Sequence, residues 1–116
     1  MNPGCSNSEI KKLQLAAKKE FGVAIPQSFI CLLKLSNGIQ INTAFFKQAE
    51  NLIADNLDFK SPEVIVLGNS GNVEAYIFDR RDGKFYAVNI FNFDERFESY
   101  ATFEAMLSAI MQAQMF

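Results

Sequence analysis

VIVLGNSGNVEAYIFDRRDGKFYAVNI spans residues 64–90, and the rest of this chain is predicted to fold around it. Residues 64–67 are all β-branched or aliphatic, and a run with both faces apolar is typical of an inner strand that is covered on both sides. Residues 73–78 then alternate between two faces with the period of a strand, and residues 85–90 return as a third strand. The stretch therefore predicts three strands of one sheet.

Two turns separate these strands. Residues 68–72 are dense in turn formers, and their glycines can supply positive φ values. Asp82-Gly83 is a hairpin signal, and we expect it to bring Asp79 and Lys84 close together across the turn. Both connections are too short for a crossover helix, so the strands are predicted to pair antiparallel.

A helix is predicted near the start of the chain. Residues 1–7 are expected to form a flexible lead. Ser6 and Glu9 have the spacing of a capping box, which predicts that the helix begins near residue 7. Gly22 is suited to end it, because glycine adopts the left-handed conformation of a helix C-terminus.

A second helix and a poorly patterned segment follow. Ile25-Pro26 predicts the start of the helix and Asn37-Gly38 its end. Residues 39–41 and 44–46 are candidates for short strands. Residues 47–62 show no regular period, and such a segment in a compact domain is either a functional loop or a misread element.

A last helix closes the chain. Thr102 is placed to cap it, and an apolar stripe then recurs at helical spacing. The predicted order is thus two helices, mostly antiparallel strands and one helix. This order indicates an α+β fold in a single domain of residues 1–116.

Composition restricts the class of protein. A chain of 116 residues suits one domain, and 49% hydrophobic residues argue against disorder. The net charge of −2 argues against nucleic acid as the main partner, and no apolar run is long enough to span a bilayer. The first twelve residues carry no apolar signal core, and two cysteines make no disulfide framework. We therefore expect a cytoplasmic protein.

Few residues suggest catalysis. The chain has no histidine, which is the commonest general base and metal ligand. Cys31 is expected to be a small buried apolar residue, because it lacks a base partner. Asp55 and Asp58 lack a third ligand and are expected to be solvated loop carboxylates, and an enzyme would need a deep polar site around them. We therefore expect no cofactor, no metal and no enzymatic activity.

The segment after the third strand interleaves aromatic and acidic side chains. An edge strand is predicted around residues 96–100, with Phe97 pointing inward. Asp94, Glu95 and Glu98 form the most acidic cluster of the chain. Such a cluster is either a docking surface for a basic partner or a charged edge that blocks aggregation between strands, and both interpretations stay open. A glycosidase-type pair of carboxylates is far less favoured, because it needs a cleft and a raised pKa.

Three local patterns along the chain resemble the SUKH superfamily. They are FGVAIPQSFICLLKLSNG (21–38), VIVLGNSGNVEAYIFDRRDGKFYAVN (64–89) and YATFEAMLSAI (100–110). The first resembles the family's glycine, hydrophobe and proline before an aromatic-bearing helix, the second its three-strand core, and the third its closing amphipathic helix. The matching positions are Gly22, Ile25, Pro26, Phe29, Asn37, Gly38, Gly68, Gly71, Tyr76, Asp79, Gly83, Tyr86, Thr102, Phe103 and Leu107.

The resemblance implies a binding domain and not an enzyme. Many bacterial members are immunity proteins, which are made in the cytoplasm to bind and block a toxin domain, often a nuclease, of polymorphic or contact-dependent toxin systems. Other members are regulatory or scaffold proteins, so an intracellular regulator or adaptor with no toxin partner is the alternative. The matched residues are largely structural, and none carries over as a catalytic residue.

The partner-binding surface is expected at Phe93, Asp94, Glu95, Glu98 and Tyr100. A nuclease site is basic because it binds phosphates, so the three carboxylates would face it. Phe93 or Tyr100 would act as the aromatic anchor. The expected partner is a basic protein domain, with no nucleic acid and no membrane. The chain itself is expected to be a monomer or a weak homodimer.

Overall fold

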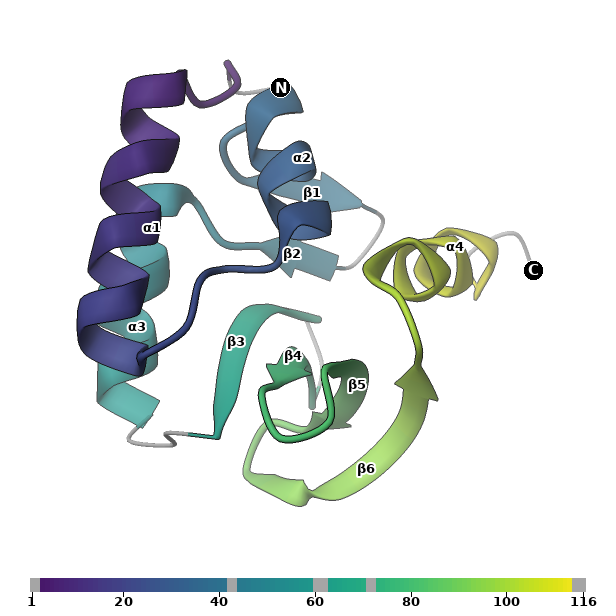
Figure 1. Ribbon diagram of the computed structural model, residues 1–116. Coiled ribbons are helices and arrows are strands. Elements are labelled where there is room, and N and C mark those ends of the chain that lie inside the picture. The colour runs from purple at the N-terminus through teal and green to yellow at the C-terminus, as the bar shows by residue number, and fades with distance from the viewer. Residues whose placement is uncertain (1–2, 42–43, 60–62, 71–72, 114–116) are drawn as a thin grey trace.

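The computed structural model describes residues 3–41, 44–59, 63–70 and 73–113. Within these ranges it contains four helices and six strands, which confirms the predicted α+β class (Figure 1). The helices are α1 (Asn7–Phe21), α2 (Gln27–Leu35), α3 (Ala49–Phe59) and α4 (Phe103–Ala113). The strands are β1 (Ile39–Ile41), β2 (Ala44–Phe46), β3 (Val64–Ser70), β4 (Glu74–Asp79), β5 (Lys84–Asn89) and β6 (Asn92–Tyr100).

The six strands form one antiparallel sheet in which each strand pairs with its neighbour in the sequence. This order makes β1 and β6 the two edges of the sheet. Figure 1 shows that the sheet curls, so that β6 bends round the β4–β5 hairpin and leads into α4. Helices α1 and α3 lie side by side, and α3 contacts β3 (Figure 1).

The main core lies between the sheet and the helices. Phe29 of α2, Phe46 of β2 and Phe103 of α4 meet there, and each is at most 4% exposed. Their ring centroids are 6.4 Å apart for Phe29–Phe46, 5.5 Å for Phe29–Phe103 and 5.6 Å for Phe46–Phe103. Burying one side chain of this size stabilises a fold by roughly 1.5–3 kcal/mol. These three rings therefore fasten elements from the beginning, middle and end of the chain to one another.

A second, smaller apolar cluster lies on the opposite face of the sheet. Its buried members are Val64, Val66, Ala75, Ile77 and Val88, and Tyr86, Ile90 and Phe93 pack against them. All of these residues belong to β3, β4, β5, β6 or the turn before β6. Side chains of the curled sheet itself therefore contribute the packing on this face.

The boundaries of α1 and α4 follow the predicted capping residues. The Ser6 hydroxyl accepts a hydrogen bond from Glu9 N at 3.2 Å, and Ser6 N donates to Glu9 Oε1 at 3.0 Å. Gly22 ends α1 in the left-handed conformation, with φ 77°. Thr102 Oγ1 accepts a hydrogen bond from Ala105 N at 3.1 Å. The predicted starts of both helices and the predicted end of α1 are confirmed.

The poorly patterned segment, residues 47–62, contains helix α3. Leu52 is fully buried on this helix, and Asn56, one turn later, is 5% exposed although it is polar. Asn56 Nδ2 donates to Val66 O at 2.9 Å, and Val66 N donates to Asn56 Oδ1 at 2.5 Å. The pairing of β2 with β3 begins only at Gly68, so the Asn56 amide binds the β3 backbone beyond the end of β2.

Residues 3–5 pack against the end of α2. Cys5 N donates a hydrogen bond to Leu33 O at 2.8 Å, and Asn37 N donates to Pro3 O at 3.0 Å. The Cys5 side chain is buried in the main core. The described part of the segment that we expected to be a flexible lead is thus held by backbone hydrogen bonds.

Gly68 lies within β3 and not in a turn. A Cβ atom at this position would lie 2.4 Å from the carbonyl oxygen of Phe45, so the glycine allows β2 to approach closely. The strand continues to Ser70. The remaining residues of the predicted turn, 71 and 72, lie outside the described residues.

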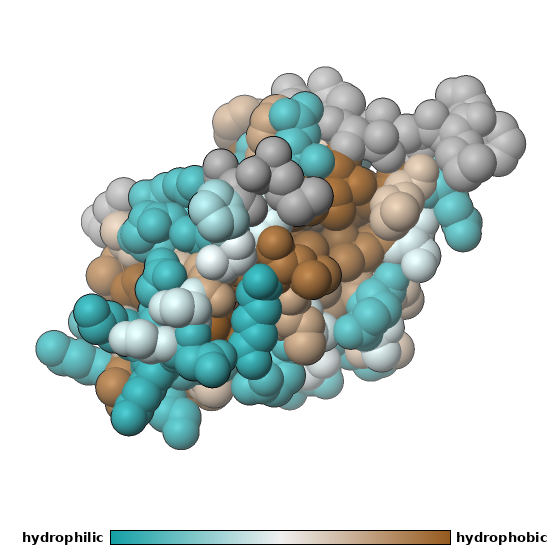
Figure 2. Space-filling model, turned by 90° about the horizontal axis from the view of Figure 1, so that it is seen from above, coloured by the Kyte–Doolittle hydropathy of each residue, from teal (hydrophilic) through white to brown (hydrophobic). Residues whose placement is uncertain are grey.

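Exposed apolar side chains lie on α2 and α4. Leu35 of α2 is 74% exposed and Met111 of α4 is 55% exposed. Cys31 is also exposed, so its predicted burial is wrong. Ile30 and Leu33 face the core, and the helical spacing therefore turns Cys31 towards solvent. Figure 2 shows the molecule from above, with hydrophobic residues gathered near the centre of the face in view.

Candidate functional site

Strand β6, which carries the predicted site residues, is an edge strand with an irregular register against β5. Ala87 faces Glu98 and Val88 faces Arg96, so Phe97 is an extra residue in β6. A bulge of this kind breaks the two-residue alternation of a strand. Phe97 is 43% exposed as a result, and the prediction that it points inward is wrong.

The structure places the three predicted carboxylates, Asp94, Glu95 and Glu98, in exposed positions on β6. Asp94 and Glu95 lie in a bulged part of the strand. Asn92 of β6 pairs with Asn89 of β5, and the next residue of β6 that pairs is Arg96, which faces Val88. Asn89 Nδ2 donates a hydrogen bond to Glu95 Oε2 at 3.0 Å. The three acids thus share one edge strand, and one of them is fixed by the neighbouring strand.

The two predicted aromatic anchors pack into different cores. Phe93 packs against the second apolar cluster, whereas Tyr100 packs against the main core. Burial raises the pKa of Tyr100, and the nearby Glu98 carboxylate raises it further. Both rings are partly buried, so they contribute to packing.

Phe91, in the turn between β5 and β6, is 85% exposed, and this turn presents its ring to solvent.

A buried carboxylate lies beside the acidic edge. The Asp79 side chain is 2% exposed and accepts hydrogen bonds from Arg81 Nε at 3.0 Å, Arg81 Nη2 at 2.8 Å and Arg96 Nη2 at 2.7 Å. The bonds from Arg81 and then those from Arg96 hold the pKa of Asp79 well below its usual range, although burial opposes this. Arg96, the one arginine of β6, therefore pairs with this buried acid at the end of β4.

Tyr86 extends this arrangement over the sheet. The guanidinium carbon of Arg96 lies 4.0 Å from the centroid of the Tyr86 ring, a cation–π contact. The Tyr86 hydroxyl donates a hydrogen bond to Asp82, which lowers the pKa of Asp82 and raises that of Tyr86. Together, Asp79, Arg81, Asp82, Tyr86 and Arg96 form what we call the ionic cluster. It connects the β4–β5 turn to β6.

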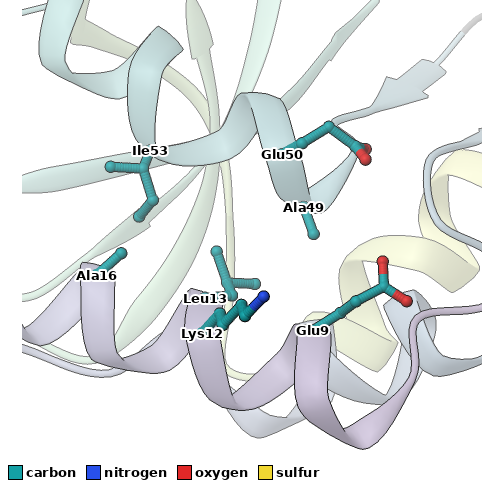
Figure 3. Close-up of a pocket in the computed structure, with 7 residues that line it drawn as sticks. All are labelled: Glu9, Lys12, Leu13, Ala16, Ala49, Glu50 and Ile53. Atoms are coloured by element: carbon teal, nitrogen blue, oxygen red, sulfur yellow. The ribbon is translucent and has the colours of Figure 1, made fainter.

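A second candidate site is a groove of about 330 Å³ between α1 and α3 (Figure 3). It is lined by Glu9, Lys12, Leu13, Ala16, Ala49, Glu50 and Ile53. Figure 3 shows the side chains of α1 and those of α3 on opposite sides of the groove. Glu9 caps α1, and Glu50 accepts hydrogen bonds from Asn37 Nδ2 at 3.0 and 3.3 Å. Two of its charged groups thus hold helix ends, and most of its other side chains are apolar.

The two remaining candidate acids are Asp55 and Asp58, and the structure describes the side chain of the first. Asp55 lies on α3 and forms an ion pair with Lys47 at 3.0 Å, while the side chain of Asp58 lies outside the described residues. Among the residues that the structure describes, no group of three His, Cys, Asp or Glu side chains is arranged to hold a metal ion. No helix in the described ranges is long and apolar enough to cross a membrane.

Sequence reasoning missed Phe91 and the ionic cluster. Phe91 lies in the two-residue turn that Asn89 and Asn92 close, and a large apolar residue in so tight a turn is a usable signal. The cluster leaves no such signal, because Arg81 and Arg96 are far apart in the sequence. They meet at Asp79 in the folded chain, where β4, β5 and β6 pair side by side.

Comparison with known families and proteins completes the description of the site. The sequence model of the SMI1 / KNR4 family (SUKH-1) matches residues 4–109, which include all ten helices and strands except the last residues of α4. No curated protein matches the chain. The exposed acids of β6 and the exposed Phe91 in the turn before it fall within the matched range.

Proposed function

The chain belongs to the SMI1 / KNR4 family (SUKH-1), and from this membership we propose that it is a cytoplasmic immunity protein. It binds a cognate toxin domain of a bacterial polymorphic or contact-dependent toxin system and neutralises it. The toxin domain is a nuclease in this proposal. Membership of a family associated with immunity against toxins is the observation that carries the proposal.

The geometry of β6 supports a basic protein partner. The strand carries three exposed carboxylates and one arginine, and this arginine pairs with buried Asp79. A nuclease cleft is positively charged because it holds phosphates. An acidic strand that enters or covers such a cleft competes with the nucleic acid for the same basic groups. It also speeds the encounter through long-range attraction.

The bulges of β6 favour docking through side chains. An edge strand pairs readily with another chain when it is long and flat, whereas bulges and charged side chains prevent this. Register shifts interrupt β6 at two places, and Asp94 and Glu95 lie within the first of these along the strand. The partner is therefore recognised by the exposed side chains of β6 and not by addition of a strand to the sheet.

Co-expression tests the proposal. The probe is the C-terminal domain of a large secreted protein encoded by the neighbouring gene, expressed from an inducible promoter in cells that do or do not carry this chain. We expect the chain to restore growth and to form a one-to-one complex with that domain on size exclusion. A toxin domain of the same class from another locus is the control and should remain toxic. Unprotected growth without a complex, or a neighbouring gene of metabolic or cell-wall function, would contradict the proposal.

A further inference from the structure

The turn between β5 and β6 presents the most exposed of the large apolar side chains among the described residues, that of Phe91 at 85%. One exposed apolar residue is ordinary on a soluble protein and needs no explanation by itself. The surroundings of Phe91 give it more weight, because the ring is held on a short turn next to the acidic part of β6. A role of Phe91 in binding a partner rests on the proposed function.

The side chain of Asn89 bonds to both the Phe91 backbone and the Glu95 carboxylate. Asn89 Oδ1 accepts a hydrogen bond from Phe91 N at 2.9 Å, and the Nδ2 group of the same amide donates to Glu95 Oε2 at 3.0 Å. On the other side of the turn, Asn92 Oδ1 accepts from Asp94 N at 3.1 Å. The turn therefore holds the backbone of the aromatic residue and the acid in a fixed relation before any partner binds.

Such preorganisation lowers the entropy lost on association. A Phe side chain has only two rotatable bonds, and its backbone is already fixed by the turn. A carboxylate accepts several hydrogen bonds, so Glu95 can bind a lysine or arginine while it remains bonded to Asn89. The pair combines an apolar anchor with an adjacent negative charge.

We infer that Phe91 is the anchor residue of the interface with the toxin domain. Its ring enters an apolar pocket at the edge of the basic cleft, and Glu95 binds a lysine or arginine at the rim of that pocket. Asn89 is a positioning residue that sets the distance between the two. This assigns the anchor to the turn before β6, whereas Phe93 and Tyr100 are partly buried against the two apolar clusters.

The test compares Phe91→Ala with Leu35→Ala. Both changes truncate an exposed apolar side chain, 85% exposed in one case and 74% in the other, so neither should alter the melting temperature much. The probe is the toxin domain that the wild-type chain binds. We expect Phe91→Ala to raise the Kd of the complex with this domain roughly thirtyfold or more, which is the scale of an interface hot spot. Leu35→Ala should leave that Kd within about twofold of the wild-type value.

Two results would overturn the inference. One is a Kd for Phe91→Ala within about twofold of the wild-type value, and the other is an equal loss in both variants. Wild-type binding is measured in the same series. If the wild-type chain itself fails to bind, the proposed function fails together with this inference, and that outcome is distinct from failure of the anchor alone.

Asn89→Ala tests the positioning role. We expect it to weaken binding about three- to tenfold in the wild-type background and by less than twofold when Phe91 is already alanine. A merely structural role would give the same loss in both backgrounds, and that result would contradict the assignment of Asn89.

Discussion

At the scale of single residues, Asp79 joins three parts of the chain. It ends β4, binds Arg81 in the following turn and binds Arg96 in β6. Its side chain is 2% exposed, so the two guanidinium groups replace the water that the carboxylate loses on folding. Asp79 is also one of the positions that match the SUKH pattern. The structure therefore gives a physical reason for an acid there, which is to attach the edge strand to the β4–β5 hairpin.

Asp79→Asn should destabilise the fold by about 2–3 kcal/mol at neutral pH, because two arginines lose a charged partner. The pKa of Asp79 is lower in the folded than in the unfolded chain, so its stabilisation is complete above the unfolded pKa of about 4 and is lost as the pH falls further. Urea unfolding at pH 7 and pH 3 measures both effects.

The difference between the wild-type chain and Asp79→Asn should therefore be smaller at pH 3 than at pH 7. Asp94→Asn, an exposed change on β6, is the control and should cost less than about 0.5 kcal/mol at pH 7. An equal difference at both pH values would show that the charge of Asp79 does not stabilise the fold.

At the scale of elements, the sequence predicts most of the sheet and the helix ends but not α3. Strand positions follow from local alternation, and caps follow from residues such as Ser6 and Gly22, so both are readable within a short window. Helix α3 is missed because buried Asn56 interrupts its apolar stripe. That residue binds a β3 backbone ten positions away, and no local pattern reveals such a contact.

In the candidate site, too, local features are predicted from the sequence and contacts between distant residues are not. The sequence locates the exposed acids of β6, because charge needs no three-dimensional information. It misplaces Phe97, since a bulge changes which residues face outward, and the bulge depends on pairing with β5. The direction of an aromatic side chain on an edge strand is thus less predictable than the charge of the strand.

Asn56→Ala should destabilise the fold by roughly 2–3 kcal/mol, because the N–H and C=O of Val66 lose their buried partner. Asn51→Ala on the same helix is the matched control. Its side chain is exposed and donates a hydrogen bond to the nearby Gln48 side chain at 3.3 Å, so a change of less than about 0.5 kcal/mol is expected. Urea midpoints measure both variants. Similar midpoints for the two would exclude the proposed link between α3 and β3.

At the scale of the whole molecule, the lysines of α1 and the acids of β6 lie on different sides. Helix α1 carries four lysines and two glutamates, whereas β6 carries three acids and one arginine that pairs with Asp79. Figure 1 shows α1 and β6 on different sides of the molecule. A net charge of −2 therefore understates the polarity of the surface. A basic partner is attracted to the β6 side, and that side also holds Phe91.

The rate of association with the toxin domain is the strongest test of β6 as the partner-binding surface. The double variant Glu95→Lys with Glu98→Lys reverses two charges on β6, and Glu20→Lys with Glu104→Lys makes the same change in net charge on α1 and α4, at exposed positions. Stopped-flow mixing should show that the β6 variant associates about tenfold or more slowly at low salt and binds more weakly, while the control stays within about twofold of the wild type. Unchanged affinity in the β6 variant, or an equal loss in both variants, would contradict the assignment of β6 as the partner-binding surface.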